Sequence, residues 1–351
     1  MDCGSAVCGS RISLNFMLEY MNMNKDFLIN IADRLYGVAL LDEIPTGNPT
    51  SLVYEAAAGQ NRYILKVQKY SEQRASHMEF ESGWVSYLSE YMNGIAKTVT
   101  SRSGRAYETA AVGTEQYILS LQQKAEGKIV DVNNPDEFNI RLFKRLGGVM
   151  GQMHSLTTHY DKNISSPEFK WNGPNFWRAG LTIPDADVRR SESLLVAEIE
   201  RLPAGSDSYG IVHFDIHTDN LLIDRDGSLT VIDFDTCQFN WYAADIASAL
   251  FLALMKKVPP RPNRSESERT DFAEAFLRAY LEGYRETRAL DRYWLSRLDL
   301  FMRYQMVDEY MAAKLYWPDT DDELREWYVG WHRDRLVQGL PYVCIDYNKF
   351  F

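Results

Sequence analysis

Alternating apolar and polar residues predict that the first part of the chain forms strands. Runs rich in Val, Leu, Ile, Tyr and Ala cover residues 38–44, 51–57 and 62–68, and the turn-forming sequences TGNPT and GQN separate them. Residues 107–113 and 115–123 have the same character. Because strands joined by short turns pair in antiparallel fashion, we expect one five-stranded antiparallel sheet.

Helical spacing, with apolar residues three and four positions apart, accompanies this sheet. Residues 24–35 precede the first strand, and residues 77–92 (HMEFESGWVSYLSEYM) form the main helix between the third and fourth strands. These segments define a first lobe over residues 24–123. Residues 1–23 lack a comparable pattern, and we expect them to be a disordered leader.

The pattern changes after the sequence KAEGK. Residues 136–157, 185–201 and most of 243–338 show helical spacing, whereas residues 211–235 alternate in the manner of a strand hairpin. We therefore predict a larger, mainly helical second lobe over residues 124–351, with a small embedded sheet. The expected fold class is α+β, arranged as two lobes.

Composition and charge narrow the partners and the compartment. The 351 residues are 45% hydrophobic and 25% charged, with a formal net charge of -11 and no run of Lys or Arg. This balance argues against nucleic acid and membrane partners and mildly favours a cationic substrate. The four cysteines show no CxxC spacing, which predicts a reducing, cytoplasmic location. Composition leaves monomer and homodimer open.

Polar chemistry is concentrated in residues 211–235 (IVHFDIHTDNLLIDRDGSLTVIDFD). Asp215 precedes Asn220 by five positions, and Asp233 follows the strand-like run LTVI. In phosphoryl transfer, one carboxylate accepts the proton of the attacking hydroxyl, while an amide oxygen and a second carboxylate hold Mg²⁺ on the nucleotide phosphates. The spacing predicts this division of roles.

The same residues leave two alternatives to a kinase open. A zinc hydrolase using His213 and His217 would need further ligands, and the other four histidines show no ligand spacing. The second alternative is a catalytically silent nucleotide-binding module. We expect His213 to bond the backbone, and His217 to approach the phosphates or brace the turn. Asp245 is expected to cap its helix or hold the catalytic loop, and His154 to be a core histidine.

Four segments resemble the aminoglycoside phosphotransferase and choline kinase-like family. HFDIHTDN is similar to the family motif HGDxHxxN, and VIDFD to its counterpart of the kinase DFG. WYAADIA (241–247) and LGGVMGQMHSL (146–156) resemble the elements W-x-x-DIA and LGxxLxxLHxL. Phe214 departs from the usual glycine of the motif. The resemblance implies a protein-kinase-like fold and phosphate transfer from ATP or GTP to a small molecule.

Residue roles follow from this resemblance. It implies Asp215 as catalytic base and Asn220 and Asp233 as Mg²⁺ ligands. Lys66, in the run YILKV, matches the lysine that contacts the α- and β-phosphates. Glu81 on the next helix matches the ion-pair partner of this lysine, with Glu79 as the second choice.

The nucleotide would also meet two backbone segments of the first lobe. Residues 47–51, ending at Ser51, correspond to the phosphate-covering loop, although they contain no GxGxxG. Residues 119–123 correspond to the hinge, where Leu121 and Gln123 would offer backbone groups to adenine.

The acceptor is predicted to be a small hydroxyl compound and not a protein. Only twelve positions separate Asp233 from Asp245, no APE follows, and no arginine precedes Asp215, so the activation segment of a protein kinase has no counterpart. An aminoglycoside or an amino alcohol fits, and drug resistance and metabolism both remain open as the role.

Carboxylates and aromatic rings that could surround a cationic acceptor are concentrated in residues 304–331. Two further rings follow the loop that carries the predicted metal ligand Asp233. In the alternative interpretation, the rings pack terminal helices and the acids form a solvated face. The candidate residues for the acceptor site are Trp241, Tyr242, Asp308, Glu309 and Trp317.

Overall fold

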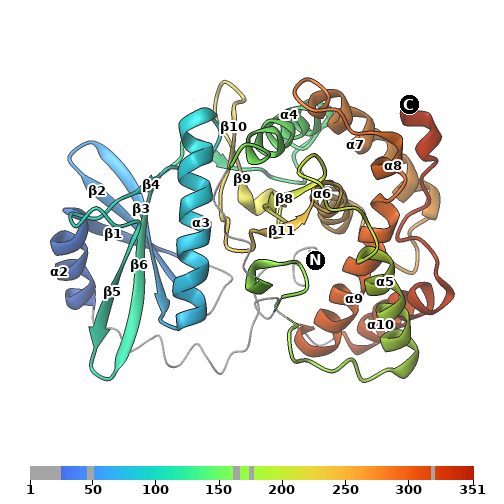
Figure 1. The fold of residues 1–351 in the computed structure, drawn as a ribbon, viewed down its shortest axis with the longest axis horizontal. Coiled ribbons are helices and arrows are strands. Elements are labelled where there is room, and N and C mark those ends of the chain that lie inside the picture. The colour runs from blue at the N-terminus through green and yellow to red at the C-terminus, as the bar shows by residue number, and fades with distance from the viewer. Residues whose placement is uncertain (1–24, 46–50, 161–166, 174–177, 318–320) are drawn as a thin grey trace. The chain divides into compact units, whose positions relative to one another are not determined.

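The structure is a computed structural model that describes residues 25–45, 51–160, 167–173, 178–317 and 321–351. The expected leader, residues 1–23, lies outside the described residues. The chain folds as two compact units that divide between Glu126 and Gly127 (Figure 1).

The N-terminal unit is built on an antiparallel sheet in the order β1-β2-β3-β6-β4, with β5 paired to β6. The five strands that the sequence predicts are confirmed. The sixth, β4, is only two residues long, too short to produce an alternating pattern. The strands are β1 (Ala39–Ile44), β2 (Ser51–Ala58), β3 (Asn61–Lys69), β4 (Thr98–Val99), β5 (Tyr107–Val112) and β6 (Glu115–Gln123).

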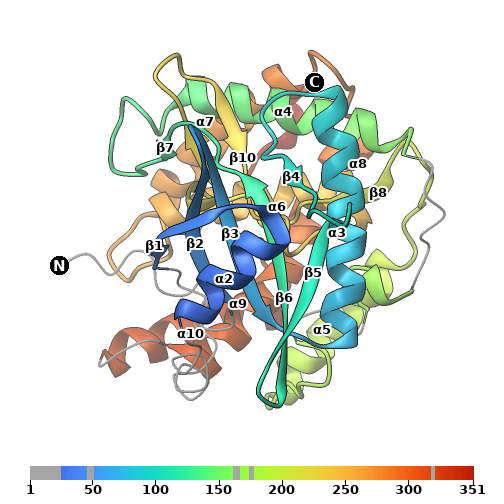
Figure 2. The ribbon, with the colours of Figure 1, turned by 90° about the vertical axis from the view of Figure 1, so that its left-hand side faces the viewer.

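Two helices cover opposite faces of this sheet (Figures 1 and 2). Helix α2 (Lys25–Tyr36) buries Leu28 and Ile31 in a core cluster that includes Leu119 and Leu121 of β6. Helix α3 (Glu72–Tyr91) packs against Ile118 of the same strand. Since successive side chains of a strand point to opposite faces, the alternation along β6 places the two helices on the two sides of the sheet.

The C-terminal unit is mainly helical, as predicted, and contains two small antiparallel sheets, β10-β9-β7 and β11-β8. None of the helices in the described part of the chain combines the length and apolar composition needed to span a membrane. The helices are α4 (Ile140–Thr157), α5 (Ala186–Ile199), α6 (Tyr242–Lys257), α7 (Glu266–Tyr284), α8 (Arg292–Leu295), α9 (Leu298–Tyr316) and α10 (Asp322–Gln338). The strands are β7 (Lys128–Ile129), β8 (Tyr209–Val212), β9 (Leu221–Ile223), β10 (Leu229–Val231) and β11 (Gln238–Trp241).

Glycines allow α4 and α7 to approach very closely. A Cβ atom at Gly147 of α4 would lie 1.9 Å from the carbonyl oxygen of Tyr280, and one at Gly283 of α7 would lie 1.8 Å from that of Lys144. Both positions therefore exclude every side chain. In the LGGVMGQMHSL sequence, Gly147 is required by this helix contact, which fixes the helix that carries His154.

The predicted hairpin in residues 211–235 is only partly confirmed. Strands β9 and β10 form it, with Leu222 opposite Thr230. The run around Val212 instead belongs to β8, which pairs with β11, and Val212 lies opposite Gln238. This long-range pairing places the loop after β8 between the β9–β10 hairpin and the start of α6.

Candidate active site

The loop that follows β8 is held by a buried carboxylate from α6. Oδ2 of Asp245 accepts the backbone N–H of His213 at 3.2 Å, and Oδ1 accepts that of Phe214 at 2.8 Å. The hydroxyl of Ser248, one turn later, donates to the carbonyl of Phe214 at 2.9 Å. Asp245 thus holds the catalytic loop, and the helix cap is instead Trp241, which makes no side-chain capping bond.

Asp245 in turn is fixed by His154 of α4, which is fully buried. Nε2 of His154 lies 2.9 Å from Oδ2 of Asp245, and Nδ1 lies 2.9 Å from the hydroxyl of Tyr284. Burial lowers the pKa of His154, although the hydrogen bond to Asp245 acts in the opposite direction. Both ring nitrogens have partners, which confirms His154 as a satisfied core histidine.

Two residues of the site adopt backbone angles that side chains other than glycine rarely take. Phe214 has φ of 66° and Asp233 has φ of 61°, the two non-glycine residues with positive φ in the described part of the chain. Each such angle costs on the order of 1–2 kcal/mol. The family motif has glycine where this chain has Phe214, and the backbone angle explains that preference.

The segment carrying Asp233 is bonded directly to the loop carrying Asp215 and Asn220. The backbone N–H of Ile232 donates to the carbonyl of Asn220 at 3.0 Å, and the carbonyl of Ile232 accepts from Nε2 of His213 at 3.1 Å. The hydroxyl of Thr236 donates to the carbonyl of His213 at 2.8 Å. Residues separated by more than ten positions therefore meet in one small region.

Within the loop, the amide of Asn220 is oriented by Asp215. Nδ2 of Asn220 donates to the carbonyl of Asp215 at 2.9 Å. The amide oxygen must then point away from this contact. Asn220 is buried, whereas Asp215 is partly exposed and Asp233 is exposed, so the two carboxylates can meet a ligand.

His217 lies against the carboxylate of Asp215, with 3.5 Å between Nε2 and Oδ2. Burial by itself would raise the pKa of Asp215, but the hydrogen bond and charge of His217 outweigh it and lower the pKa. Conversely, burial would lower the pKa of His217, and the bond to Asp215 raises it above the usual value. Asp215 is therefore ionised at neutral pH, as an acceptor of a proton must be.

Neither histidine of HFDIH is arranged as a metal ligand. Nδ1 of His213 accepts the N–H of Asp215 at 3.3 Å, and Nδ1 of His217 accepts that of Asp219 at 3.2 Å. The described residues include no group of three or more His, Cys, Asp and Glu side chains that could hold a metal ion. The predicted backbone role of His213 and the bracing role of His217 agree with these bonds.

Sequence reasoning missed a salt bridge that extends this network. Nζ of Lys256, at the end of α6, lies 2.7 Å from Oδ2 of Asp219, and that oxygen lies 3.6 Å from Nδ1 of His217. The Lys256 side chain is only 6% exposed, whereas that of Asp219 is 54% exposed, so the contact lies at the surface with only the lysine enclosed. The two residues are 37 positions apart, too far for a local spacing pattern to reveal the pair. Ser248 is different, because at i+3 it shares a helix face with Asp245 and could be found from the sequence.

The nucleotide-binding candidates of the N-terminal unit lie on the sheet and on α3. Lys66 is partly buried on β3, opposite Val53 and Ser120. Glu81 is 4% exposed, whereas Glu79 is exposed on the same helix. A buried carboxylate requires a compensating charge or hydrogen bonds, so burial favours Glu81 over Glu79 as the partner of a lysine.

The other candidates of this unit have different backbone environments. Ser51 is buried at the start of β2, and residues 47–50 of the expected covering loop lie outside the described residues. Leu121 is fully buried in β6. The N–H of Gln123 donates to the carbonyl of Lys97 at 2.8 Å, so that particular group is already bonded.

Trp241 and Tyr242, two candidate acceptor residues, are 4% and 2% exposed. Nε1 of Trp241 donates to the carbonyl of Pro203 at 2.8 Å, and its ring contacts Trp171 and Tyr209. The Tyr242 ring stacks on His154, with 4.6 Å between centroids. These contacts place both rings in the packing at the start of α6.

Asp308, Glu309 and Trp317 are held by two neighbours. Asp308 forms an ion pair with Arg178. Glu309 accepts the hydroxyl of Tyr328 at 2.8 Å, and the ring of Trp317 lies 5.3 Å from that of Tyr328. The structure thus brings Glu309 and Trp317 together around Tyr328, with structural contacts that need no acceptor.

Comparison with known proteins decides the family. The phosphotransferase enzyme family (APH) matches residues 44–290. The chain belongs to this family. Amicoumacin kinase of Bacillus subtilis (strain 168) is 30% identical over 304 residues, which are 84% of this chain and 87% of that protein.

Solved structures share the fold of the chain. A structure of the amicoumacin kinase hAmiN in complex with AMP-PNP, Ca²⁺ and Ami is similar with a TM-score of 0.78 at 23% identity, covering 95% of this chain and 99% of that one. A microcompartment-associated aminopropanol kinase follows with a TM-score of 0.63 at 19% identity, covering 90% and 98%.

Family membership decides between the kinase and the zinc hydrolase. The predicted kinase-like fold is confirmed, and the chain is a small-molecule kinase that uses an alcohol group as acceptor. The zinc hydrolase interpretation is wrong, since HFDIH belongs to a phosphotransferase and its histidines bond the loop.

Proposed function

We propose that this kinase transfers the γ-phosphate of ATP or GTP to a hydroxyl of a small molecule, with Mg²⁺ as the metal. The observation that carries the proposal is the pair of hydrogen bonds that Ile232 makes, one to the carbonyl of Asn220 and one to the ring of His213. It joins the loop bearing Asp215 and Asn220 to the strand end bearing Asp233. A base and two oxygen ligands in one region match the parts that phosphoryl transfer requires.

The donor set fits Mg²⁺. Asn220 offers an amide oxygen and Asp233 an exposed carboxylate, both hard oxygen donors. Mg²⁺ usually takes one or two such protein groups and completes its shell with water and phosphate oxygens. Bound there, the ion would neutralise charge on the phosphates. The positive φ of Asp233 is the strain that this placement costs.

Asp215 acts as the base. Its lowered pKa keeps the carboxylate ionised, so it accepts the hydrogen of the acceptor hydroxyl. The acceptor oxygen then forms a bond to the γ-phosphorus while the bond from that phosphorus to the β,γ-bridging oxygen breaks. The nucleoside diphosphate leaves with the electron pair, and the proton remains on Asp215. Positioning and electrostatic stabilisation supply most of the rate enhancement.

The N-terminal unit supplies the nucleotide contacts in this proposal. Lys66 contacts the α- and β-phosphates, and Glu81 holds Lys66 in position, which is supported by the burial of Glu81 and the exposure of Glu79. Ser51 ends the covering loop. Leu121 and Gln123 of β6 lie in the hinge next to adenine, where the N–H of Gln123 is bonded to Lys97 and is not the group offered.

An amine-bearing alcohol is the acceptor class that we propose. The net charge of -11 favours a cation, and one structural neighbour is named for aminopropanol, an amino alcohol. The relative amicoumacin kinase makes amicoumacin a specific candidate. We place the activity in the cytoplasm, with either resistance or metabolism as its role.

The acceptor can be found by a thermal-shift screen of amicoumacin, amino alcohols, aminoglycosides and sugars, with and without Mg²⁺ and a nonhydrolysable nucleotide. A ligand bound to the native state raises the melting temperature by mass action. Each hit is then tested for transfer of labelled γ-phosphate. Binding of nucleotide with no transfer to any hit would instead support the silent module.

A further inference from the structure

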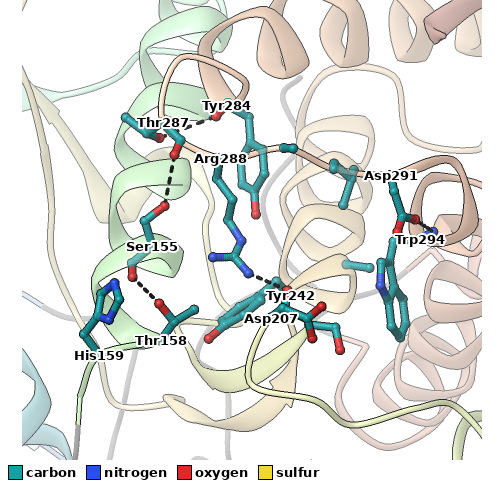
Figure 3. A pocket seen from close by; sticks show the side chains of 14 residues that line it. Ser155, Thr158, His159, Asp207, Tyr242, Tyr284, Thr287, Arg288, Asp291 and Trp294 are labelled. Atoms are coloured by element: carbon teal, nitrogen blue, oxygen red, sulfur yellow. Dashed lines mark hydrogen bonds between the residues drawn. The ribbon is translucent and has the colours of Figure 1, made fainter.

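The helical unit contains a cavity of about 550 Å³ that the proposed reaction does not use. It lies between the end of α4, the loop before β8, the start of α6 and the segment that joins α7 to α8 (Figure 3). The volume lies within the ~300–1,000 Å³ of small-molecule sites. The walls combine polar side chains and aromatic rings with the aliphatic residues Ala243, Ala289 and Leu290.

Two opposite charges line this cavity. The guanidinium of Arg288 lies over the Tyr242 ring, 4.5 Å from its centroid, and Nη2 donates to the backbone carbonyl of Asp207. Both Arg288 and the Asp207 carboxylate influence the pKa of Tyr242, so both charges lie close to that ring. Within the described parts of the chain, neither Arg288 nor the Asp207 carboxylate forms a salt bridge.

The hydroxyl groups of the cavity present lone pairs. Ser155 donates its hydrogen to the carbonyl of Thr287 at 3.3 Å, and Thr158 donates to that of Ser155 at 2.7 Å. Their oxygens can then accept hydrogen bonds from a ligand. Trp294, partly exposed, adds an aromatic face on the other side of Arg288 (Figure 3).

We propose that this cavity is a second binding site, for a small zwitterion such as a free α-amino acid. The carboxylate of the ligand pairs with Arg288, and its ammonium group is accepted by Asp207 and the hydroxyl oxygens. Planar guanidinium groups match carboxylates in two-point contacts. A molecule with only one of the two charges would leave either Arg288 or Asp207 without its partner.

The cavity is linked to the catalytic loop through its floor. The Tyr242 ring stacks on His154 at an interplanar angle of 28°, and the Tyr284 hydroxyl is bonded to the same histidine. His154 holds Asp245, which accepts the backbone N–H groups of His213 and Phe214. Two side chains therefore separate the floor of the cavity from the backbone that precedes the catalytic base.

Tyr242 provides a second link. A Cβ atom at Gly210 would lie 2.3 Å from the Tyr242 hydroxyl, so this ring touches the backbone of β8 three residues before His213. The hydroxyl itself is buried and has no hydrogen-bond partner among the described residues. A ligand that fixes the Tyr242 ring would restrict β8 and the loop, and ordering of this kind couples two sites.

Calorimetry on the full chain tests the ligand class. The probes are the twenty proteinogenic amino acids, ethanolamine as the ammonium without carboxylate, and lactate as the carboxylate without ammonium. We expect at least one amino acid to bind, and both single-charge probes to bind at least about tenfold more weakly, the loss of one charge-assisted contact. Binding of ethanolamine or lactate as tight as that of the best amino acid, or no binding by any amino acid, would overturn the proposal.

Variants locate the binding. Arg288→Gln and Asp207→Asn each remove one charge with little change in shape, and each should weaken the amino acid ~10- to 100-fold. Arg190→Gln and Asp226→Asn remove exposed charges outside the cavity and serve as matched controls. Unchanged affinity in both cavity variants would place the ligand elsewhere and contradict the assignment.

Hydrogen exchange tests the link to the loop without any assay of phosphate transfer. Saturating amino acid should slow exchange in peptides covering residues 209–220, with smaller changes in the N-terminal sheet. Unchanged exchange in 209–220 would contradict the coupling. Because these readouts need no acceptor or nucleotide, their failure is distinguishable from failure of the proposed reaction.

Discussion

The catalytic loop and the α9–α10 segment contain similar side chains and place them in opposite electrostatic environments. In the loop, the hydrogen bond and charge of His217 overcome burial and lower the pKa of Asp215. In α9, burial dominates and raises the pKa of Glu309 to about 7 and that of Asp308 to about 6. Burial therefore leaves one carboxylate ionised and drives another toward its protonated form, depending on the groups around it.

The two segments differ in the surroundings of their carboxylates and not in their composition. Asp215 has a histidine beside it and solvent access, and the backbone around it is held from outside by Asp245. Glu309 is 5% exposed and meets one hydroxyl, that of Tyr328. Chemistry at neutral pH needs the first arrangement. The second favours a protonated acid, which attracts a cationic acceptor less strongly.

The largest effect is expected from removal of the base. Asp215→Asn keeps the shape of the side chain but cannot take the hydroxyl proton, so kcat should fall by ~10²–10⁴. Nucleotide affinity should stay within about twofold, since the base touches the acceptor. Steady-state kinetics and calorimetry measure the two quantities. Asp226→Asn, exposed in the β9–β10 turn, is the control, and parental turnover by the Asp215→Asn enzyme would refute the assignment.

Removal of the loop anchor should cost stability. Asp245→Ala leaves two backbone N–H groups and His154 without their buried acceptor. Each buried donor left without its acceptor costs about 1–3 kcal/mol, so the free energy of unfolding should fall by at least ~2 kcal/mol. Urea unfolding measures the free energy, with Asp226→Ala as the surface control. A change below ~1 kcal/mol would show that Asp245 does not hold the loop.

The buried acid of α9 predicts a pH dependence of stability. The pKa of Glu309 is about 7 in the folded chain against a usual 4.5, so the folded state favours the protonated form. Its contribution is complete below pH ~4.5 and is lost as pH rises through 7. Relative to Glu309→Gln, the parent should lose about 3 kcal/mol between pH 4.5 and 8. A constant difference between the two proteins across this range would contradict the raised pKa.

The smallest effect concerns the strained backbone of the loop. At φ of 66°, glycine is favoured over alanine, so Phe214→Gly should be more stable than Phe214→Ala by about 1 kcal/mol. In an ordinary conformation the order is reversed. Thermal unfolding of the two variants decides the sign, and an alanine variant as stable as the glycine variant would show that the angle carries no strain.

Local patterns predicted much of the fold. Short alternating runs gave the strands of the N-terminal sheet nearly to the residue, because alternation is a property of neighbours. The motif spacing predicts Asp215, Asn220 and Asp233 as site residues, and the structure brings the segments that carry them together. Two-residue strands such as β4 were not predicted, because two positions are too few to show an alternating pattern.

Contacts between distant segments could not be predicted in this way. The pairing of β8 with β11, the bond from His154 to Asp245 and the Lys256–Asp219 salt bridge each join residues far apart in sequence. The same holds for burial. Trp241 lies eight positions after Asp233, and only the packing of Trp171 and Tyr209 around it shows that it is enclosed.

The metal dependence of nucleotide affinity tests the central claim most directly. Calorimetric titration of nucleotide at increasing Mg²⁺ is compared between the parent, Asn220→Ala and Asp233→Ala, with Asp226→Ala as the control. We expect Mg²⁺ to tighten binding in the parent and the control, and to have little effect in Asp233→Ala. The same Mg²⁺ dependence in all four proteins would contradict the assignment of Asn220 and Asp233 as metal ligands.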